Sequence, residues 1–432
     1  MDPVHVWILL LVFALLILLG VPISFGIGIA TLAVMLLSIK TGPALTTVAQ
    51  RMATGLDSFA LLAIPFFILS GQLMNRGGIA RRLIDFAKVL VGRFPGGLAF
   101  VNIMAAMFFG AISGSAVAAA AAIGGFMAPM MRKEGYDRDY SAAVNITSAT
   151  TGLIIPPSNI LIVYSLASGG VSIGALFVAG YVPGILVGIF LMIVAGVIAH
   201  RRGYATAPGL GFRRGLGKLL DAIPSLFMVI LVIGGIVAGY FTATEASAIA
   251  VLYTFVLSVL IYREVRWQEL PKILLDSAST TAIVMLLIAT SMGMSWIFSF
   301  ENIPQTVSAS LLSLSSSPVV ILLVINLGLL LVGTFMDMTP AVLIFTPIFL
   351  PVVVQLGVDP IHFGIIMVLN LSIGLCTPPV GSVLFVGCGI AGTPIASVIR
   401  PLLPLFLAML AALMAVTFVP VLSLWLPRLF GY

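Results

Sequence analysis

Apolar residues recur along the whole chain in runs of about 20 residues, the length at which a helix crosses ~30 Å of hydrocarbon. The runs are continuous rather than alternating with polar residues, and a membrane β-barrel would require alternation. The pattern therefore predicts an all-α polytopic membrane protein.

The runs divide into crossings and connectors. We assign crossings to residues 4–19, 21–39, 61–75, 140–166 and 173–199, and then to 222–238, 245–262, 278–300, 362–389 and 403–426. An amphipathic connector covers 43–59. The basic amphipathic stretch 77–94 has the period of a helix lying at the membrane interface.

Two further apolar segments, 97–131 and 319–354, are each interrupted by a polar turn. The first turns at ISGSA (residues 112–116) and the second at TFMDMTP (residues 334–340). Basic residues at both ends of the first segment indicate that it enters and leaves on one face. We therefore expect two re-entrant helical hairpins with these turns at their tips.

Two crossings are themselves interrupted. TTGLIIPPS breaks the first at Gly152 and Pro156-Pro157, and SIGLCTPPV breaks the second at Gly374 and Pro378-Pro379. Bare backbone inside a bilayer is tolerated only where protein or a polar cavity surrounds it. Gly152 to Ile155 is therefore predicted to line an ion site.

The chain also repeats itself. A shift of 222 residues aligns Pro129 with Pro351, Gly135 with Gly357, Gly152 with Gly374, and Pro156-Pro157 with Pro378-Pro379. We expect two copies of one unit, 1–218 and 219–432, each with five crossings and a hairpin. Because five is odd, the second copy is inverted, which is the plan of many secondary transporters.

Composition and charge agree with this plan. The chain is 61% hydrophobic and 8% charged, with a mean hydropathy of +1.25, which excludes a soluble globular protein. With the amino terminus outside, all Lys and Arg except Lys40, Arg51 and Arg428 are cytoplasmic. The net charge of +6 is thus an orientation signal, and nucleic-acid binding is not indicated.

The sequence lacks the motifs that metal binding, ATP binding and catalysis would require. The first span follows Asp2 and has no cleavage site, so we expect it to be retained rather than removed as a signal peptide. Cys376 and Cys388 form no CxxC motif, and no P-loop or HExxH motif is present. We expect no cofactor, no ATP use and no enzyme activity.

Polar residues at the tips and breaks are the candidate ligands. Ser113 and Ser115 at the first tip offer hydroxyl oxygens for a hard cation, and Asp337 is a carboxylate deep within the second hairpin. Helix packing is the alternative for the serines, and helix capping for Asp337. Asn145 is a ligand or a link between helices. For the function, we prefer a transporter coupled to sodium. The alternatives are a proton-coupled carboxylate transporter and a passive channel. An intramembrane aspartyl protease is a further alternative, but it would need a second Asp facing Asp337.

These motifs resemble the large membrane subunit of tripartite ATP-independent periplasmic (TRAP) transporters. The stretches that carry the resemblance include GRFPGGLAFVNIMAAMFFGAISGSAVA, MRKEGYDRDYSAA, GLIIPPSNILIVYS, ATEASAIAVLY and GLCTPPVGSVLFVGCGIAG. They run through nearly the whole chain. FTATEA stands where the family often has FTPTEA, a departure away from the tips and breaks.

The resemblance implies a sodium-driven importer of small organic anions in a bacterial inner membrane, with its amino terminus periplasmic. Its partners would be a periplasmic substrate-binding protein and a small four-helix membrane subunit. It also implies an elevator fold in which residues 97–168 and 319–392 form the transport domain and the other spans form a scaffold.

The resemblance also implies the site residues. The expected cation ligands are Ser113, Gly114, Ser115, Asn145, Gly152, Ile155 and Pro156 in the first half and Thr334, Met336, Asp337, Thr339, Gly374, Thr377 and Pro378 in the second. The expected substrate contacts, between the two tips, are Ser113, Ser115, Ser158 and Thr339.

Overall fold

The computed structural model describes residues 3–204, 212–315, 317–378 and 380–432. This part of the chain contains 20 α-helices and no β-strand, and eight of its helical segments are long and apolar enough to cross a membrane. The prediction of an all-α membrane protein is confirmed. Pro379, the second proline of the second break, lies outside the described residues.

The helices follow the predicted order. The first half contains α1 (Pro3–Leu18), α2 (Ile23–Ser38), α3 (Thr41–Leu56), α4 (Ala63–Arg76), α5 (Ile79–Val91), α6 (Gly97–Ser113), α7 (Ala116–Lys133), α8 (Arg138–Ala149), α9 (Asn159–Ala167) and α10 (Ile173–Arg201). The second contains α11 (Phe212–Val237), α12 (Ala243–Phe255), α13 (Leu270–Phe300), α14 (Ile303–Leu314), α15 (Pro318–Phe335), α16 (Met338–Gln355), α17 (Pro360–Gly374), α18 (Ser382–Ala391), α19 (Ile395–Phe418) and α20 (Val421–Leu429).

The carboxyl-terminal span differs from its prediction. The expected crossing 403–426 is two helices, α19 and α20, separated at Val419 and Pro420. Val419 is non-helical because Pro420 disfavours the helical conformation at the residue that precedes it. Helix α19 also begins earlier, at Ile395, because a helix can carry a charged residue such as Arg400 in its first turns.

Polar helix ends account for the other differences. Helices α11 and α13 begin at Phe212 and Leu270, before the predicted 222 and 278, since an apolar run marks only the part of a helix inside the hydrocarbon. Helix α14 was not predicted. The added turns of α13 contain Asp276, which pairs with Arg76 of α4 at 2.5 Å.

Helix α5, the basic amphipathic stretch, uses its apolar face for protein packing. Ile79, Leu83, Ile84 and Ala87 are buried, and the helix contacts α6 and α11. This face therefore packs on protein, and the predicted position of the helix at the membrane interface stays a prediction. Its hydrophobic side is covered by the hairpin and by the second half of the chain.

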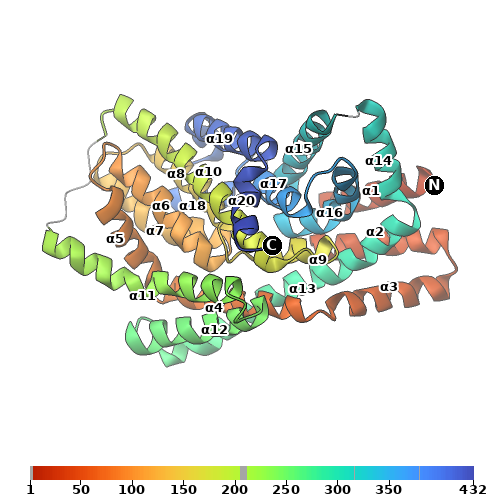
Figure 1. Cartoon of the computed structure of the whole chain (residues 1–432), viewed down its shortest axis with the longest axis horizontal. Helices are drawn as coiled ribbons and strands as arrows, with labels where there is room; N and C mark the ends of the chain where they lie inside the picture. The colour runs from red at the N-terminus through yellow and green to blue at the C-terminus, as the bar shows by residue number, and fades with distance from the viewer. Residues whose placement is uncertain (1–2, 205–211, 316, 379) are drawn as a thin grey trace.

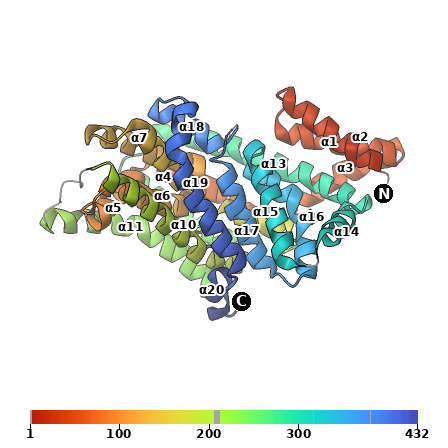
Figure 2. The same ribbon diagram turned by 90° about the horizontal axis from the view of Figure 1, so that it is seen from above.

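The helices lie at two ends and a centre along the long axis of the molecule. Helices α2 and α3 pack on α13 at one end, with α1 on α2, and α5 and α11 lie at the other end (Figures 1 and 2). Both hairpins, α6–α7 and α15–α16, pack on the interrupted helices α8 and α17 at the centre. Helices α10 and α19 contact each other and these central helices. Phe177 of α10 also packs against Phe67 of α4, with 6.5 Å between the ring centroids. The division into a transport domain and a scaffold stays a prediction.

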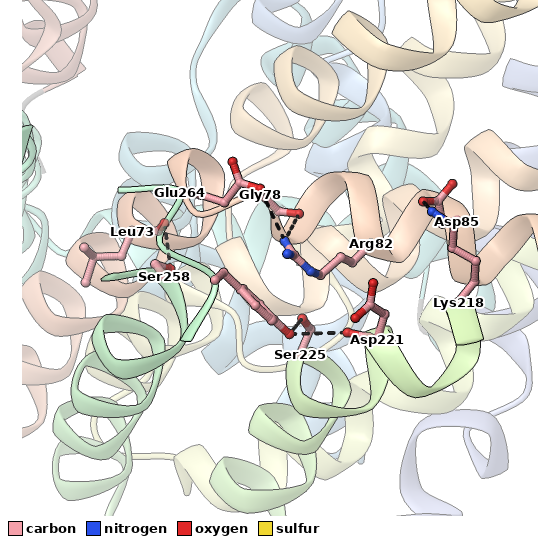
Figure 3. Close-up of polar contacts among 10 residues, drawn as sticks. Leu73, Gly78, Arg82, Asp85, Lys218, Asp221, Ser225, Ser258 and Glu264 are labelled. Carbon is pink, nitrogen blue, oxygen red and sulfur yellow. Dashed lines mark hydrogen bonds and ion pairs between the residues drawn. The ribbon is translucent and has the colours of Figure 1, made fainter. Parts of the chain in front are cut away.

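Segments predicted to share a membrane face do meet. Figure 3 shows α5, the amino-terminal part of α11 and the turn after α12 joined by polar contacts. The basic residues of these three segments are predicted to be cytoplasmic. Lys218 pairs with Asp85 at 2.5 Å, and Ser225 and Tyr262 share a hydrogen bond of 3.3 Å. The relative sidedness of these segments therefore agrees with the charge pattern. The absolute orientation stays a prediction.

Arg82 holds this junction together, and its loss should destabilise the protein. Its guanidinium lies 3.6 Å from the ring centroid of Tyr262 and donates to the Gly78 carbonyl at 3.1 Å. We expect Arg82→Ala to lower the free energy of unfolding by about 1–2 kcal/mol, the range of a partly desolvated cation–π contact. Thermal unfolding in detergent measures this. Arg81→Ala, at the exposed neighbouring position, is the control, and equal shifts for both variants would contradict the assigned role.

Candidate functional site

The two hairpin tips meet at one cavity of about 230 Å³. Gly114 and Ser115 line it from the first tip, and Asp337 and Thr339 line it from the second. Ser115 and Asp337 are separated by 222 residues, the shift of the internal repeat. Equivalent positions of the two halves therefore face the same space.

Each tip begins a helix in the same way. The Ser115 hydroxyl caps α7 by accepting from the Ala118 amide at 3.3 Å, and the Asp337 carboxylate caps α16 by accepting from the Met338 amide at 2.8 Å. Gly114 has a φ of +61°, a left-handed backbone that favours glycine. Among the described residues that line the cavity, Asp337 is the only one with a charged side chain. The amino ends of α7 and α16 thus both point at the cavity.

The half-helices that follow the two breaks also begin there. Asn159 is the first residue of α9, Ser382 is the first residue of α18, and both line the cavity. Asn159 Oδ1 and Ser382 Oγ are buried and have no hydrogen-bond partner among the described residues. The sequence predictions missed both residues, although each follows a proline-containing break, where a new helix must start.

The other side of the cavity is lined by α4 and α13, which belong to neither the hairpins nor the interrupted helices. Ile64 and Ile68 of α4 and Val284 of α13 are apolar, and Thr280 of α13 adds one hydroxyl. That hydroxyl position could not be found from the sequence, because nothing local places α13 opposite the tips.

Close glycine contacts fix the breaks against the hairpins. A Cβ atom at Gly152 would lie 2.2 Å from the Gly110 Cα of α6, and a Cβ at Gly374 would lie 2.6 Å from the Gly333 backbone of α15. Side chains essentially never approach this closely. Both halves therefore use the same backbone-to-backbone contact, and Gly152 and Gly374 are needed for packing.

Several predicted hydroxyl ligands bond to nearby backbone instead of lining the cavity. Ser113 donates to the Ser115 carbonyl at 3.5 Å, and Ser158 donates to the Leu153 carbonyl at 2.6 Å. Thr334 donates to Leu331 and Thr377 to Ile373. These four lie at the tips and breaks but do not line the cavity.

The other predicted residues lie further from the cavity. Asn145 donates to the Ala120 carbonyl of α7 at 3.0 Å and so links α8 to the hairpin, while its Oδ1 has no partner in the described part of the chain. Ile155 and Pro156 pack against Gly184 and Gly180 of α10. Met336 and Pro378 are half-buried, and neither lines the cavity.

This arrangement, with interrupted helices and hairpin tips around a central cavity, is a membrane-transporter fold. The solved structure of the YdaH transporter of Alcanivorax borkumensis is similar, with a TM-score of 0.62. The similarity covers 90% of this chain and 88% of that one at 16% sequence identity, so it concerns the fold alone.

The chain belongs to the family described as tripartite ATP-independent periplasmic transporter, DctM component, whose model matches residues 10–422. The protein YgiK of Salmonella typhimurium is 55% identical over 97% of this chain and 96% of its own length. The C4-dicarboxylate TRAP transporter large permease DctM of Pseudomonas aeruginosa is 42% identical over 87% and 88%. The sialic acid TRAP transporter large permease SiaM of Vibrio cholerae is 40% identical over 96% of both.

Family membership makes this chain the large permease subunit of a TRAP transporter, a multi-pass membrane protein. The resemblance read from the motifs is thereby confirmed. The two permeases named for their substrates differ in the anion they import, a dicarboxylate in one case and a sugar acid in the other.

Proposed function

We propose that this subunit imports a small organic anion by sodium symport. One observation carries the proposal: tips and half-helix ends from both halves of the chain meet at a single cavity. A site built from interrupted helices at the interface of two repeats is the arrangement secondary transporters use for substrate and coupling ion.

Helix ends supply the charge that an anion needs. Residues at the amino ends of α7, α9, α16 and α18 line the cavity, and each such end carries about half a positive charge. The described lining residues include no Lys, Arg or His. The substrate anion would therefore be stabilised by backbone amides and by the Ser382 hydroxyl, whose oxygen has no partner among the described residues.

Asp337 would bind the coupling ion. Its carboxylate faces the same cavity, so a bound anion would meet a negative charge unless a cation lay between them. Carboxylate, hydroxyl and carbonyl oxygens are the ligands that hard cations prefer. Sodium at the two tips would join the anion to the ion gradient, with Ser115 and Asp337 as its side-chain ligands.

The packing favours an elevator movement with a modified division of the chain. The hairpins, the interrupted helices, α10 and α19 would move as the transport domain, since they pack on one another. Helices α1 to α4 and α11 to α13 would form the scaffold. Helices α5 and α14, each lying just before a hairpin, would connect the two.

The family description supports two partners for this chain. A soluble periplasmic protein would deliver the anion, and a small membrane subunit would complete the permease. The bacterial inner membrane is the location that fits a periplasmic partner.

Reconstitution tests the function. We expect proteoliposomes holding both membrane subunits to accumulate the anion only when the periplasmic protein is present and sodium is higher outside. Uptake of radiolabelled carboxylates, with and without each gradient, is the measurement. Accumulation driven by a proton gradient alone would favour the proton-coupled alternative, and flux without either gradient or partner would favour a passive channel.

A further inference from the structure

A second cavity, of about 460 Å³, lies between the amino end of α8, the carboxyl end of α10 and the amino end of α19. None of its lining residues belongs to the cavity at the hairpin tips. Three arginines, Arg201, Arg202 and Arg400, and two aspartates, Asp137 and Asp139, line it. The charged side chains among the described lining residues therefore sum to a net charge of +1.

Both carboxylates are already engaged by the protein. Asp137 caps α8 by accepting from the Tyr140 amide at 2.8 Å and lies 3.6 Å from Arg202. Asp139 accepts a hydrogen bond from the Thr393 hydroxyl. Arg202 also donates to the Tyr204 hydroxyl at 3.2 Å, and so is held in place.

Arg201 and Arg400 remain without a partner in the described part of the chain, and both are exposed. They come from different helices, α10 and α19, and line the same cavity. A guanidinium binds phosphate oxygens in pairs through its planar fork of donors. The two free arginines therefore suit a single phosphate group.

The flanks of this cavity are apolar and open to the surroundings. On α10, Ile193 and Val197 precede Arg201 by two turns and one turn, and their exposed fractions are 59% and 48%. On α19, Leu403 and Leu407 follow Arg400 and are 56% and 54% exposed. In a membrane protein, exposed apolar residues of spanning helices face acyl chains. Each arginine therefore ends an apolar stripe.

We propose that this cavity binds the headgroup phosphate of an anionic phospholipid, with its acyl chains along the exposed stripes of α10 and α19. A phosphodiester carries one negative charge and would neutralise the one left by the five charged side chains. Basic pockets between helices at the cytoplasmic face are sites where anionic headgroups bind. The segments that form this cavity all belong to the face predicted to be cytoplasmic.

Lipid binding to the purified permease tests the proposal. In detergent with phosphatidylcholine as the background lipid, added phosphatidylglycerol should raise the melting temperature, and native mass spectrometry should show it bound. Inorganic phosphate tests the headgroup chemistry without acyl chains and should give little or no shift. Equal effects of phosphatidylcholine and phosphatidylglycerol, or a full effect of phosphate alone, would overturn the proposal.

Variants locate the site. Arg201→Gln and Arg400→Gln should each reduce phosphatidylglycerol affinity about fivefold, the factor expected for one basic residue near a lipid phosphate. Arg132→Gln, an exposed arginine at the end of α7 that does not line the cavity, should leave it unchanged. Each variant is measured singly, so a folding defect in one leaves the other informative. Unaltered binding in both arginine variants would show that the lipid binds elsewhere.

Discussion

Gly152→Ala should abolish transport and strongly destabilise the permease, although it adds one methyl group. That methyl carbon would lie 2.2 Å from the Gly110 Cα, where ordinary contacts begin near 3.4 Å. Both neighbours are backbone, so the hairpin and the interrupted helix must separate. Overpacking of this kind costs about 1–3 kcal/mol or more. We expect a clear fall in melting temperature and at least a tenfold loss of uptake, about 1.4 kcal/mol or more in activation free energy.

The internal repeat supplies a second test of the same contact, and α7 supplies a control. Gly374→Ala should behave like Gly152→Ala, since its methyl group would lie 2.6 Å from the Gly333 backbone. Gly125→Ala, at an exposed position of α7 with no atom within 4 Å of the added carbon, should be tolerated. If Gly152→Ala and Gly125→Ala gave equal melting temperatures and uptake, the glycine contact would have no role in stability or transport.

Asp337→Asn should separate the charge of this residue from its capping role. Asparagine caps helices about as well as aspartate, so α16 should keep its first turn. If the carboxylate helps to hold sodium, the apparent sodium affinity should fall at least tenfold, corresponding to about 1.4 kcal/mol. Sodium dependence of initial uptake rates in proteoliposomes is the measurement.

Asp359→Asn is the matched control for that variant. Asp359 caps α17 by accepting from the Ile361 amide at 2.7 Å and does not line the cavity. Its replacement should leave the sodium dependence unchanged. Ser115→Ala, at the equivalent position of the first tip, should also weaken sodium dependence. Sodium affinity that was normal in both Asp337→Asn and Ser115→Ala would rule out the assigned cation ligands.

The two cavities have different chemical characters, which explains how their ligands would differ. Asp337 is the one charged side chain among the described residues that line the tip cavity, and helix ends would supply its positive potential. A substrate must also be released from that site. Partial positive charge spread over several backbone amides would hold an anion less tightly than a guanidinium, and so suits transport. The second cavity presents free guanidiniums, which suit a ligand that stays bound.

The sequence alone determined the class of protein, the order of its spans, and the positions of its tips and breaks. These follow from local rules: hydrocarbon thickness sets the length of an apolar run, and a glycine followed by a proline pair interrupts a helix. A single proline, such as Pro183 in α10, is tolerated inside a helix. The ends of spans were less accurate. Arg400 and Asp276 lie within helices because charged residues outside the hydrocarbon do not terminate a helix.

Only the tertiary structure decided which of the polar residues face the cavity. The hydroxyls of Ser113 and Ser158 donate to neighbouring carbonyls. Asn159 and Ser382, in contrast, each have a buried oxygen beside the tips with no partner among the described residues. It also placed α13 opposite the tips and covered the apolar face of α5 with protein. Such outcomes depend on which distant segments meet, and the local periodicity of a helix carries no information about the neighbour that its side chains will contact.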